Sequence, residues 1–124
     1  MKKFNENKEY FWEYDYWFGE DFLKGIFKDQ YLRKFSLDGA GIYHLLLIDN
    51  KIYSLSLKET NKLLLNDGKK AFRDETKDII IQDISNEFTK MGIEHTINGG
   101  KFITFKIFDY IGKIEIVKKA AMPS

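Results

Sequence analysis

Residues 42–57, which read IYHLLLIDNKIYSLSL, decide the fold of this chain. Residues 42–48 form an apolar run, and in residues 52–57 apolar and polar side chains alternate, as in a strand with one buried face. Asp49, Asn50 and Lys51 between them make a short polar connection, which is typical of an antiparallel hairpin. Because its first strand is apolar nearly throughout, we expect that strand in the interior of the sheet.

A second hairpin and a helix are predicted in the second half. Residues 93–97 and 101–108 flank Asn98-Gly99-Gly100, whose residue types tolerate the positive φ of tight turns. Before them, apolar residues at helical spacing predict a helix from a cap at Thr76 to Met91, with Gly92 as its stop. After them, a turn at residues 109–112 leads to a last strand at residues 113–117.

The first third is less regular. Alternation and aromatic content favour a strand at residues 10–18, although a helix also fits the spacing there. Glu20 and Asp21 are typical of a helix first turn, and an apolar stripe at helical spacing runs on to Phe35. Residues 36–41 indicate a loop, and residues 58–67 a short helix.

These elements predict an α+β fold. Hairpins predominate, so we expect a mostly antiparallel sheet of five to six hairpin-connected strands, with two main helices packed on one face. Residues 1–124 form a single domain in this interpretation, with loose tails at residues 1–8 and 119–124.

Composition limits the functional classes. The 124 residues carry a net charge of +1, so overall charge indicates neither nucleic acid nor a membrane surface as partner. The absence of cysteine excludes disulfides and thiolate chemistry. No apolar run is long enough for a signal peptide or a membrane span, which predicts a soluble, cytoplasmic protein.

The inventory of catalytic residues is poor. The two histidines, His44 and His95, are not brought together by their spacing; the first fits a buried histidine and the second a surface one. Serine nucleophile elbows, phosphate-binding glycine loops and metal-ligand clusters are absent from the sequence. We therefore expect no catalytic residues, no metal and no cofactor, and lean against an enzyme.

The segment 10–18 carries the functional hypothesis, because seven of its nine residues are aromatic and the other two are acids. Residues 9–23 contain five acids and no lysine or arginine, so this surface would repel phosphates, and direct nucleic-acid binding is not expected. Aromatic anchors surrounded by acids suit a basic protein partner. On alternation, the predicted partner-binding residues are Glu13, Asp15 and Trp17, with Glu20 and Asp21 beside them.

The sequence hypothesis is a non-catalytic inhibitor or immunity-type antitoxin that neutralises a basic bacterial toxin such as a nuclease. A phage-type inhibitor of a host defence enzyme would use the same binding physics. The alternative is a module that binds a small molecule or peptide, or a modest enzyme, with a pocket near His44. The partner and the oligomeric state are not given by the sequence.

Overall fold

The structure, a computed structural model, describes residues 19–37, 41–64, 74–98 and 101–121. The segment 10–18 therefore lies outside the described residues. The described elements are α2 (Asp21–Phe27), the 3-10 helix η3 (Lys28–Gln30), β1 (Tyr31–Leu37), β2 (Gly41–Ile48), β3 (Lys51–Glu59), α3 (Glu75–Met91), β4 (Glu94–Asn98), β5 (Phe102–Ile107) and β6 (Tyr110–Ala121).

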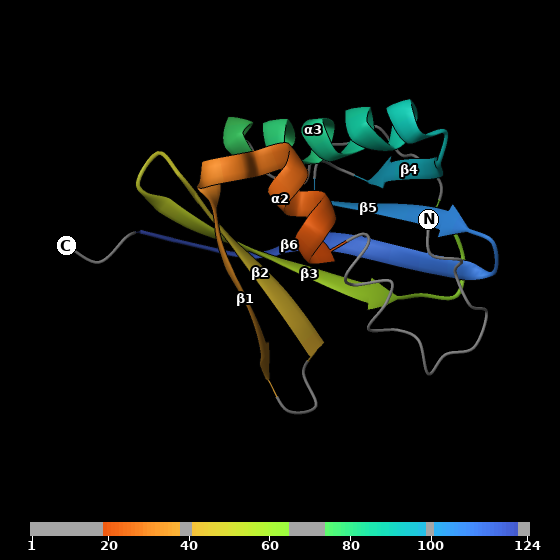
Figure 1. Ribbon diagram of the computed structural model, residues 1–124, viewed down its shortest axis with the longest axis horizontal. Helices are drawn as coiled ribbons and strands as arrows, with labels where there is room; N and C mark the ends of the chain where they lie inside the picture. The colour runs from red at the N-terminus through yellow and green to blue at the C-terminus, as the bar shows by residue number, and fades with distance from the viewer. Residues whose placement is uncertain (1–18, 38–40, 65–73, 99–100, 122–124) are drawn as a thin grey trace.

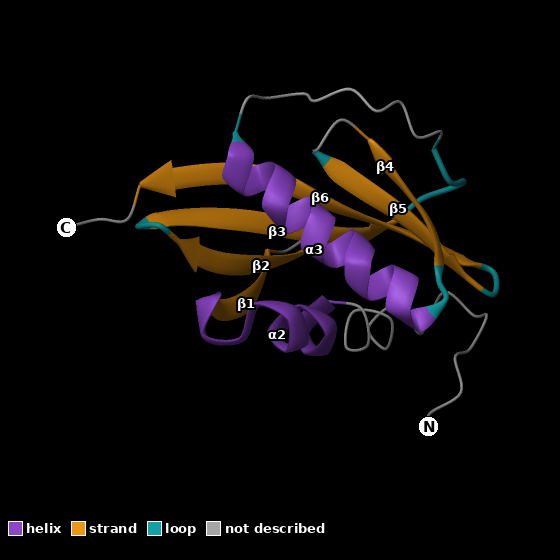
Figure 2. Cartoon of the chain, turned by 90° about the horizontal axis from the view of Figure 1, so that it is seen from above, coloured by secondary structure: helices purple, strands orange, loops and turns teal. Residues whose placement is uncertain are grey.

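The six strands form one antiparallel sheet in the order β1-β2-β3-β6-β5-β4. Each of the two described α-helices precedes a three-stranded meander, and the two meanders join along β3 and β6. Both helices cover the same face, and α3 crosses it diagonally (Figure 1, Figure 2). The predicted α+β fold, with hairpin-connected strands and two helices on one face, is confirmed.

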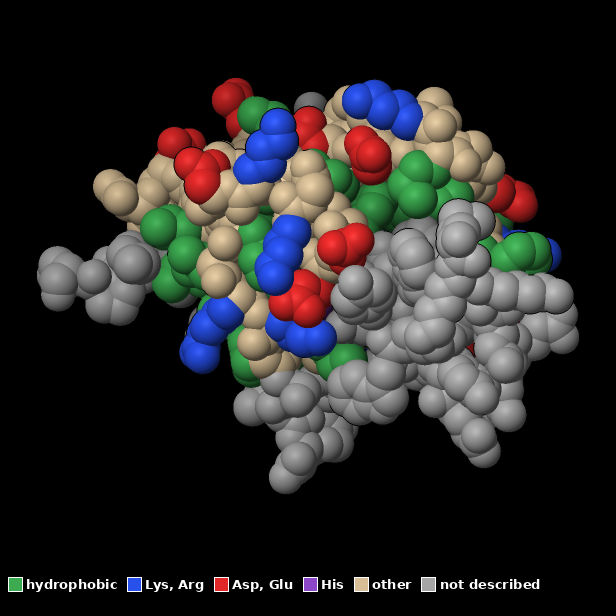
Figure 3. Space-filling model, in the orientation of Figure 1, with side chains coloured by type: hydrophobic (Ala, Val, Ile, Leu, Met, Phe, Trp, Pro, Cys, Tyr) green, Lys and Arg blue, Asp and Glu red, His purple; other side chains and the backbone are tan. Residues whose placement is uncertain are grey.

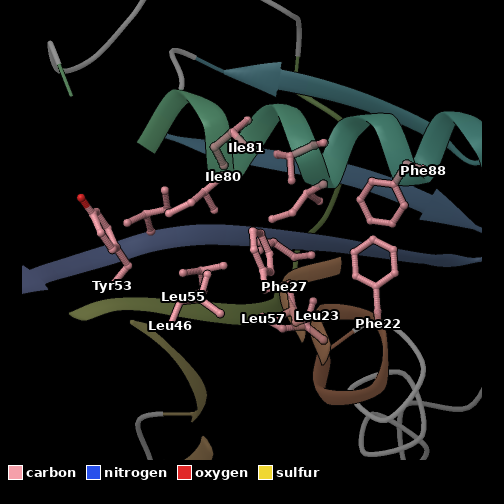
Figure 4. Packing of buried hydrophobic residues seen from close by; sticks show 14 of the residues in the cluster. Phe22, Leu23, Phe27, Leu46, Tyr53, Leu55, Leu57, Ile80, Ile81 and Phe88 are labelled. Carbon is pink, nitrogen blue, oxygen red and sulfur yellow. The ribbon is translucent and has the colours of Figure 1, made fainter. Parts of the chain in front are cut away.

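The hydrophobic core fills the space between the helices and this face of the sheet (Figure 4). Its centre is a column of three aromatic rings, Phe22 from α2, Phe88 from α3 and Phe105 from β5. Ring centroids are 4.8 Å apart in both the Phe22–Phe88 and the Phe88–Phe105 pair. The column therefore ties both helices to the sheet through one set of contacts.

Both predicted hairpins are present. β2 pairs with β3 and lies between β1 and β3, inside the sheet as its apolar sequence predicts. Asp49 and Asn50 form the turn with φ values of 53° and 62°, a conformation that these two residue types adopt more readily than most. β4 pairs with β5 in the same antiparallel manner.

The prediction of one helix running on to Phe35 is wrong. α2 ends at Phe27, and Lys28 follows with a φ of 53°, which no α-helix accommodates. Tyr31 and Phe35 lie instead in β1, which pairs with β2. The loop predicted at residues 36–41 is accordingly shorter, because β1 extends to Leu37 and β2 begins at Gly41.

Two predicted boundaries in the later part of the chain are also wrong. The helix predicted at residues 58–67 is absent from residues 58–64, because β3 continues to Glu59 and the amide of Thr60 donates to the carbonyl of Ile111, whereas residues 65–67 lie outside the described residues. The last strand spans Tyr110–Ala121 instead of residues 113–117, since it pairs with β3 along its length. It therefore includes residues 119–121, which the sequence placed in a tail.

The N-cap of α3 is Asp74, and not Thr76 as the sequence suggested. The Asp74 carboxylate accepts hydrogen bonds from the amides of Thr76 and Lys77 at 3.0 and 3.3 Å. Asp74→Ala should therefore lower the free energy of unfolding by about 1 kcal/mol in chemical denaturation, because two amides lose their acceptor. Thr76→Ala is the control and should change it by less than about 0.5 kcal/mol. A larger loss in the control would assign the cap to Thr76.

At the other end of α3, Gly92 has a φ of 72° and stops the helix as predicted. None of the helices in the described ranges combines the length and the apolar character that crossing a bilayer requires.

Candidate functional site

The predicted partner-binding residues are only partly described. Glu13, Asp15 and Trp17 lie outside the described residues, whereas Glu20 and Asp21 lie at the start of α2. Asp21 is exposed, and Glu20 is half-buried. The structure thus places the last two acids of the candidate surface next to each other on the outside of the molecule.

Glu20 is held by two lysines. Its carboxylate oxygens lie 3.0 Å from Nζ of Lys24, one turn along α2, and 3.3 Å from Nζ of Lys34 in β1. The hydrogen bond with Lys24 lowers the pKa of Glu20 below its ordinary value of 4.5; Lys34 lowers it further, whereas desolvation opposes both. Glu20 therefore ties α2 to β1, and Asp21 is the acid with the more accessible charge.

Charges of both signs surround these acids. The segment from Glu20 to Lys34 carries three acids and four basic residues, because Lys24, Lys28, Arg33 and Lys34 accompany Glu20, Asp21 and Asp29. Figure 3 shows lysine or arginine and acidic side chains interspersed over α2 and β1. The acidic character predicted from residues 9–23 does not extend along α2 into β1.

The contribution of the Glu20 ion pairs to the stability of the fold should depend on pH. Because its pKa is lowered in the folded protein, the ionised carboxylate stabilises the fold above about pH 4.5, and this contribution is lost as the pH falls through the lowered pKa. Glu20→Gln should therefore cost at most about 1 kcal/mol at pH 7, since both pairs are partly exposed, and less at pH 2. Chemical denaturation of the wild type and the variant at both pH values measures the difference in the free energy of unfolding. An equal difference at both would show that the ionised Glu20 carboxylate does not stabilise the fold.

β1 forms one edge of the sheet. A register shift between Tyr31 and Arg33 puts a bulge in it, and Leu32 at the bulge is 42% exposed. Arg33 lies over the ring of Phe35 at 5.9 Å, and that ring stacks on Tyr43 of β2. A bulge and basic side chains are devices that limit pairing of an edge with other chains, so the edge itself is a poor docking strand.

His44 lies in the core, as the sequence predicted for a buried histidine. It is 0% exposed, and its Nδ1 lies 2.8 Å from the hydroxyl of Tyr31, which is also buried. The imidazole thus has a protein hydrogen-bond partner at the place where a pocket near His44 would need a polar group to face a ligand. This geometry fits a structural histidine better than a binding residue.

His95 is not a simple surface residue as predicted, and nothing in the sequence indicated its hydrogen-bond partners. Its Nδ1 lies 2.7 Å from the carbonyl of Ile93, which can only accept, so Nδ1 carries the proton. In the neutral ring, Nε2 then accepts from the hydroxyl of Ser85, 2.9 Å away. No spacing signal in the sequence brings Ser85 of α3 and His95 of β4 together; the contact comes from packing of the helix against the strand.

The Ser85–His95 pair resembles half of a nucleophile–base arrangement but lacks the rest of one. Ser85 is 7% exposed, and it lies in the middle of α3, where neighbouring backbone amides are used by the helix itself. A serine nucleophile needs access to substrate and hydrogen-bond donors for the developing oxyanion. The pair therefore locks α3 onto β4 and supplies no catalytic centre.

Two buried polar atoms, Oγ of Ser56 and Nδ2 of Asn98, have no hydrogen-bond partner in the described part of the chain. Both residues belong to one row across the sheet, through the cross-strand pairs Ser56–Glu115, Glu115–Phe102 and Phe102–Asn98. Three strand spacings of about 4.8 Å separate them. They do not converge on one small-molecule site.

Among the described residues, no group of three or more histidines and carboxylates lies close enough to hold a metal ion.

Searches of protein-family models, of curated proteins and of solved structures found no match to this chain.

Proposed function

We propose that this chain is a non-catalytic protein-binding domain, an inhibitor or immunity-type antitoxin that acts in the cytoplasm on a basic toxin such as a nuclease. The observation that carries the proposal is the composition of residues 9–23, in which five acids and eight aromatic side chains occur without a basic residue. Aromatic side chains supply buried contact area, and surrounding carboxylates speed association with a cationic surface.

The contacts of Glu20 and Asp21 favour Asp21 as the acid that attracts a basic partner. Glu20 is already paired with Lys24 and Lys34, whereas Asp21 is exposed on the first turn of α2. Binding of a basic partner by Glu20 would require these ion pairs to rearrange. Electrostatic attraction is therefore assigned mainly to Asp21, together with Glu13 and Asp15.

The test first captures a protein partner from the native cells with the wild-type chain. It then measures the rate at which the chain and this partner associate at several salt concentrations. Glu13→Gln, Asp15→Asn and Asp21→Asn together should slow association about tenfold or more at low salt and flatten its salt dependence. Glu20→Gln alone should have a smaller effect than Asp21→Asn alone. Asp83→Asn, an exposed acid on α3, is the matched control. Unchanged rates and an unchanged salt slope in the triple variant would eliminate electrostatic capture.

The alternative function, binding of a small molecule or peptide near His44, makes a different prediction. If His44 bound a ligand, His44→Gln would abolish binding and leave stability nearly intact. Because the ring is fully buried against Tyr31, we expect this substitution to destabilise the fold by about 1–3 kcal/mol instead. Thermal unfolding of the variant separates the two.

A further inference from the structure

The face of the sheet opposite the helices, here called the open face, combines aromatic and basic side chains. Side chains alternate along each strand, so those between the core residues point away from α2 and α3. Figure 2 views the sheet from its helix-covered side, so the open face is the far one. Its described side chains include three aromatic rings and four basic groups, namely Phe35, Tyr43 and Phe102, and Arg33, Lys58, Lys106 and Lys113.

Charges of opposite sign lie on the two sides of the sheet. On the open face, the four basic groups accompany two described acids, Glu94 and Glu115, which leaves an excess of two positive charges. The described helices, with their N-cap residues Glu20 and Asp74, carry eight acids and four lysines, an excess of four negative charges. The net charge of +1 conceals this separation because it sums both sides. An anionic partner is therefore attracted to the open face and repelled by the helices.

The aromatic rings of the open face lie in one row across the sheet. The row runs through the cross-strand pairs Phe35–Tyr43, Tyr43–Ser56, Ser56–Glu115 and Glu115–Phe102. Phe35 stacks on Tyr43 with ring centroids 5.3 Å apart. Three strand spacings of about 4.8 Å separate Tyr43 from Phe102. Two stacking positions at this separation suit an extended polymer better than a compact ligand.

A cation accompanies the ring at each end of the row. The guanidinium of Arg33 lies 5.9 Å from the ring centroid of Phe35, and Nζ of Lys113 lies 5.1 Å from that of Phe102. Sheet domains that bind single-stranded nucleic acid stack its bases on such rings and meet its phosphates with neighbouring basic groups. The row therefore has the chemistry of a single-strand site.

The acid within the row does not cancel this character. Oε1 of Glu115 lies 3.4 Å from Nζ of Lys113, so its charge is offset within the sheet. Lys58, the cross-strand neighbour of Lys113, is exposed and adds a second lysine beside one acid. The centre of the open face thus keeps a positive excess.

The stacking positions are accessible from solvent. The Phe35 and Phe102 side chains are each half-buried, and Arg33 is exposed. Phe35 belongs to the edge strand β1, so no further strand of the sheet lies beyond its ring. Residues 60–64 reach the open face at Thr104, whose Oγ accepts from the amide of Leu64 at 3.2 Å. That contact lies in the neighbouring row, two residues along β5 from Phe102.

We infer that the open face binds single-stranded nucleic acid. One base extends the Phe35–Tyr43 stack, another stacks on Phe102, and phosphates meet Arg33 and Lys58. Neither the rings nor the cations distinguish ribose from deoxyribose, so RNA and DNA should bind alike.

This inference goes beyond the proposed function and does not rest on it. The acids assigned to a basic partner, among them Asp21, belong to residues 9–23, which repel phosphates. The open face is a different surface, and its basic groups come together only when the strands pair.

Fluorescence anisotropy with labelled uridine and thymidine octamers tests the inference on the whole chain. An octamer falls within the site sizes of about 4–16 nucleotides known for single-strand-binding sheet domains. Both octamers should bind with a Kd of about 100 µM or tighter at about 50 mM salt. Arg33→Gln and Lys58→Gln should each lower the slope of log Kobs against log salt concentration by about 0.7. Lys90→Gln, an exposed lysine on α3, is the control and should leave the slope unchanged.

Substitutions at Phe35 separate stacking from packing. Phe35→Leu keeps an apolar side chain but removes the ring, and should weaken binding of both octamers about fivefold or more. Phe35→Tyr keeps the ring and should bind as wild type does. Circular dichroism sets the temperature of the measurement, at which both variants are folded. Equal affinities of the Leu and Tyr variants would overturn the inference.

Three further results would also overturn it. The first is no binding of either octamer by the wild-type chain at about 50 mM salt. The second is equally tight binding of a duplex of the same length, which would show attraction to phosphates without stacking. The third is displacement of the octamers by polyglutamate at equal concentration, which would assign the face to an acidic protein. Each leaves the proposed function standing, because capture of a protein partner tests that function separately.

Discussion

Gly112→Ala is expected to lower the free energy of unfolding by about 3 kcal/mol, although it adds a single methyl group. A Cβ atom at this position would lie 2.5 Å and 2.7 Å from two ring carbons of Phe105 and 2.8 Å from one of Tyr110. Both rings are buried, and the Phe105 ring stacks on Phe88 in the central column. The ring cannot move away without displacing that column, because protein interiors are close-packed. Chemical denaturation measures the loss.

Gly25→Ala is the matched control for Gly112→Ala. Gly25 lies on the exposed side of α2, and a Cβ atom there would meet nothing within 4 Å. The control should raise the free energy of unfolding by about 0.5–1 kcal/mol, because alanine favours the helix and restricts the unfolded chain. A second substitution, Phe105→Leu, should recover part of the loss in Gly112→Ala by making room. Wild-type stability in Gly112→Ala would show that the rings have another arrangement.

Phe88→Ala should cost about 4 kcal/mol or more, the largest effect of any single truncation that we expect in this chain. Phe88 is fully buried and is the middle ring of the column, so its removal leaves a cavity and breaks the contacts with both Phe22 and Phe105. Domains of this size are typically stable by about 5–15 kcal/mol, so the variant should be largely unfolded at moderately raised temperature. Circular dichroism during heating measures this.

Two further substitutions in α3 serve as comparisons for the free energy of unfolding that is lost in Phe88→Ala. Ile79→Ala removes a side chain that is 58% exposed and should cost less than about 0.5 kcal/mol. Phe88→Leu keeps most of the volume and should fall between the two. A cost for Phe88→Ala no larger than that of Ile79→Ala would contradict the packing of α3 on the sheet.

Hairpins and the long helix could be predicted because their signals are local. Asp49-Asn50-Lys51 specifies a turn between two neighbouring apolar runs, and Gly92 marks the end of α3 regardless of what the helix packs against. β1 could not be read in the same way. Tyr31 and Phe35 are four residues apart, so they share a face in a helix and also in a strand. Pairing with β2 decides between the two, and that is a tertiary effect.

From the sequence, the candidate site could be predicted only as a group of acidic and aromatic residues, without the contacts that they make. The sequence gathers Glu20 and Asp21 with the aromatic segment, but it does not show that Lys34, fourteen residues later, neutralises Glu20 across the boundary between α2 and β1. It gives no sign of the Ser85–His95 hydrogen bond, which joins a helix to a strand. The turn at Phe108, where φ is 53°, was equally unpredictable, because nothing in Ile107-Phe108-Asp109-Tyr110 indicates a two-residue turn.

The join between the two meanders has a consequence for how the chain folds. Four of the five pairings in the described sheet join strands that follow one another in the sequence, whereas β3 and β6 pair across α3, β4 and β5. Each meander can form from contacts close in sequence, whereas the β3–β6 seam must close a loop of about fifty residues, which is slow to search and costly in chain entropy. Meeting of two preformed halves along this seam is therefore the expected rate-limiting event of folding. Amides that bond between β3 and β6 should then exchange whenever the two halves part, so their hydrogen exchange reports on separation of the halves and not on opening of either meander.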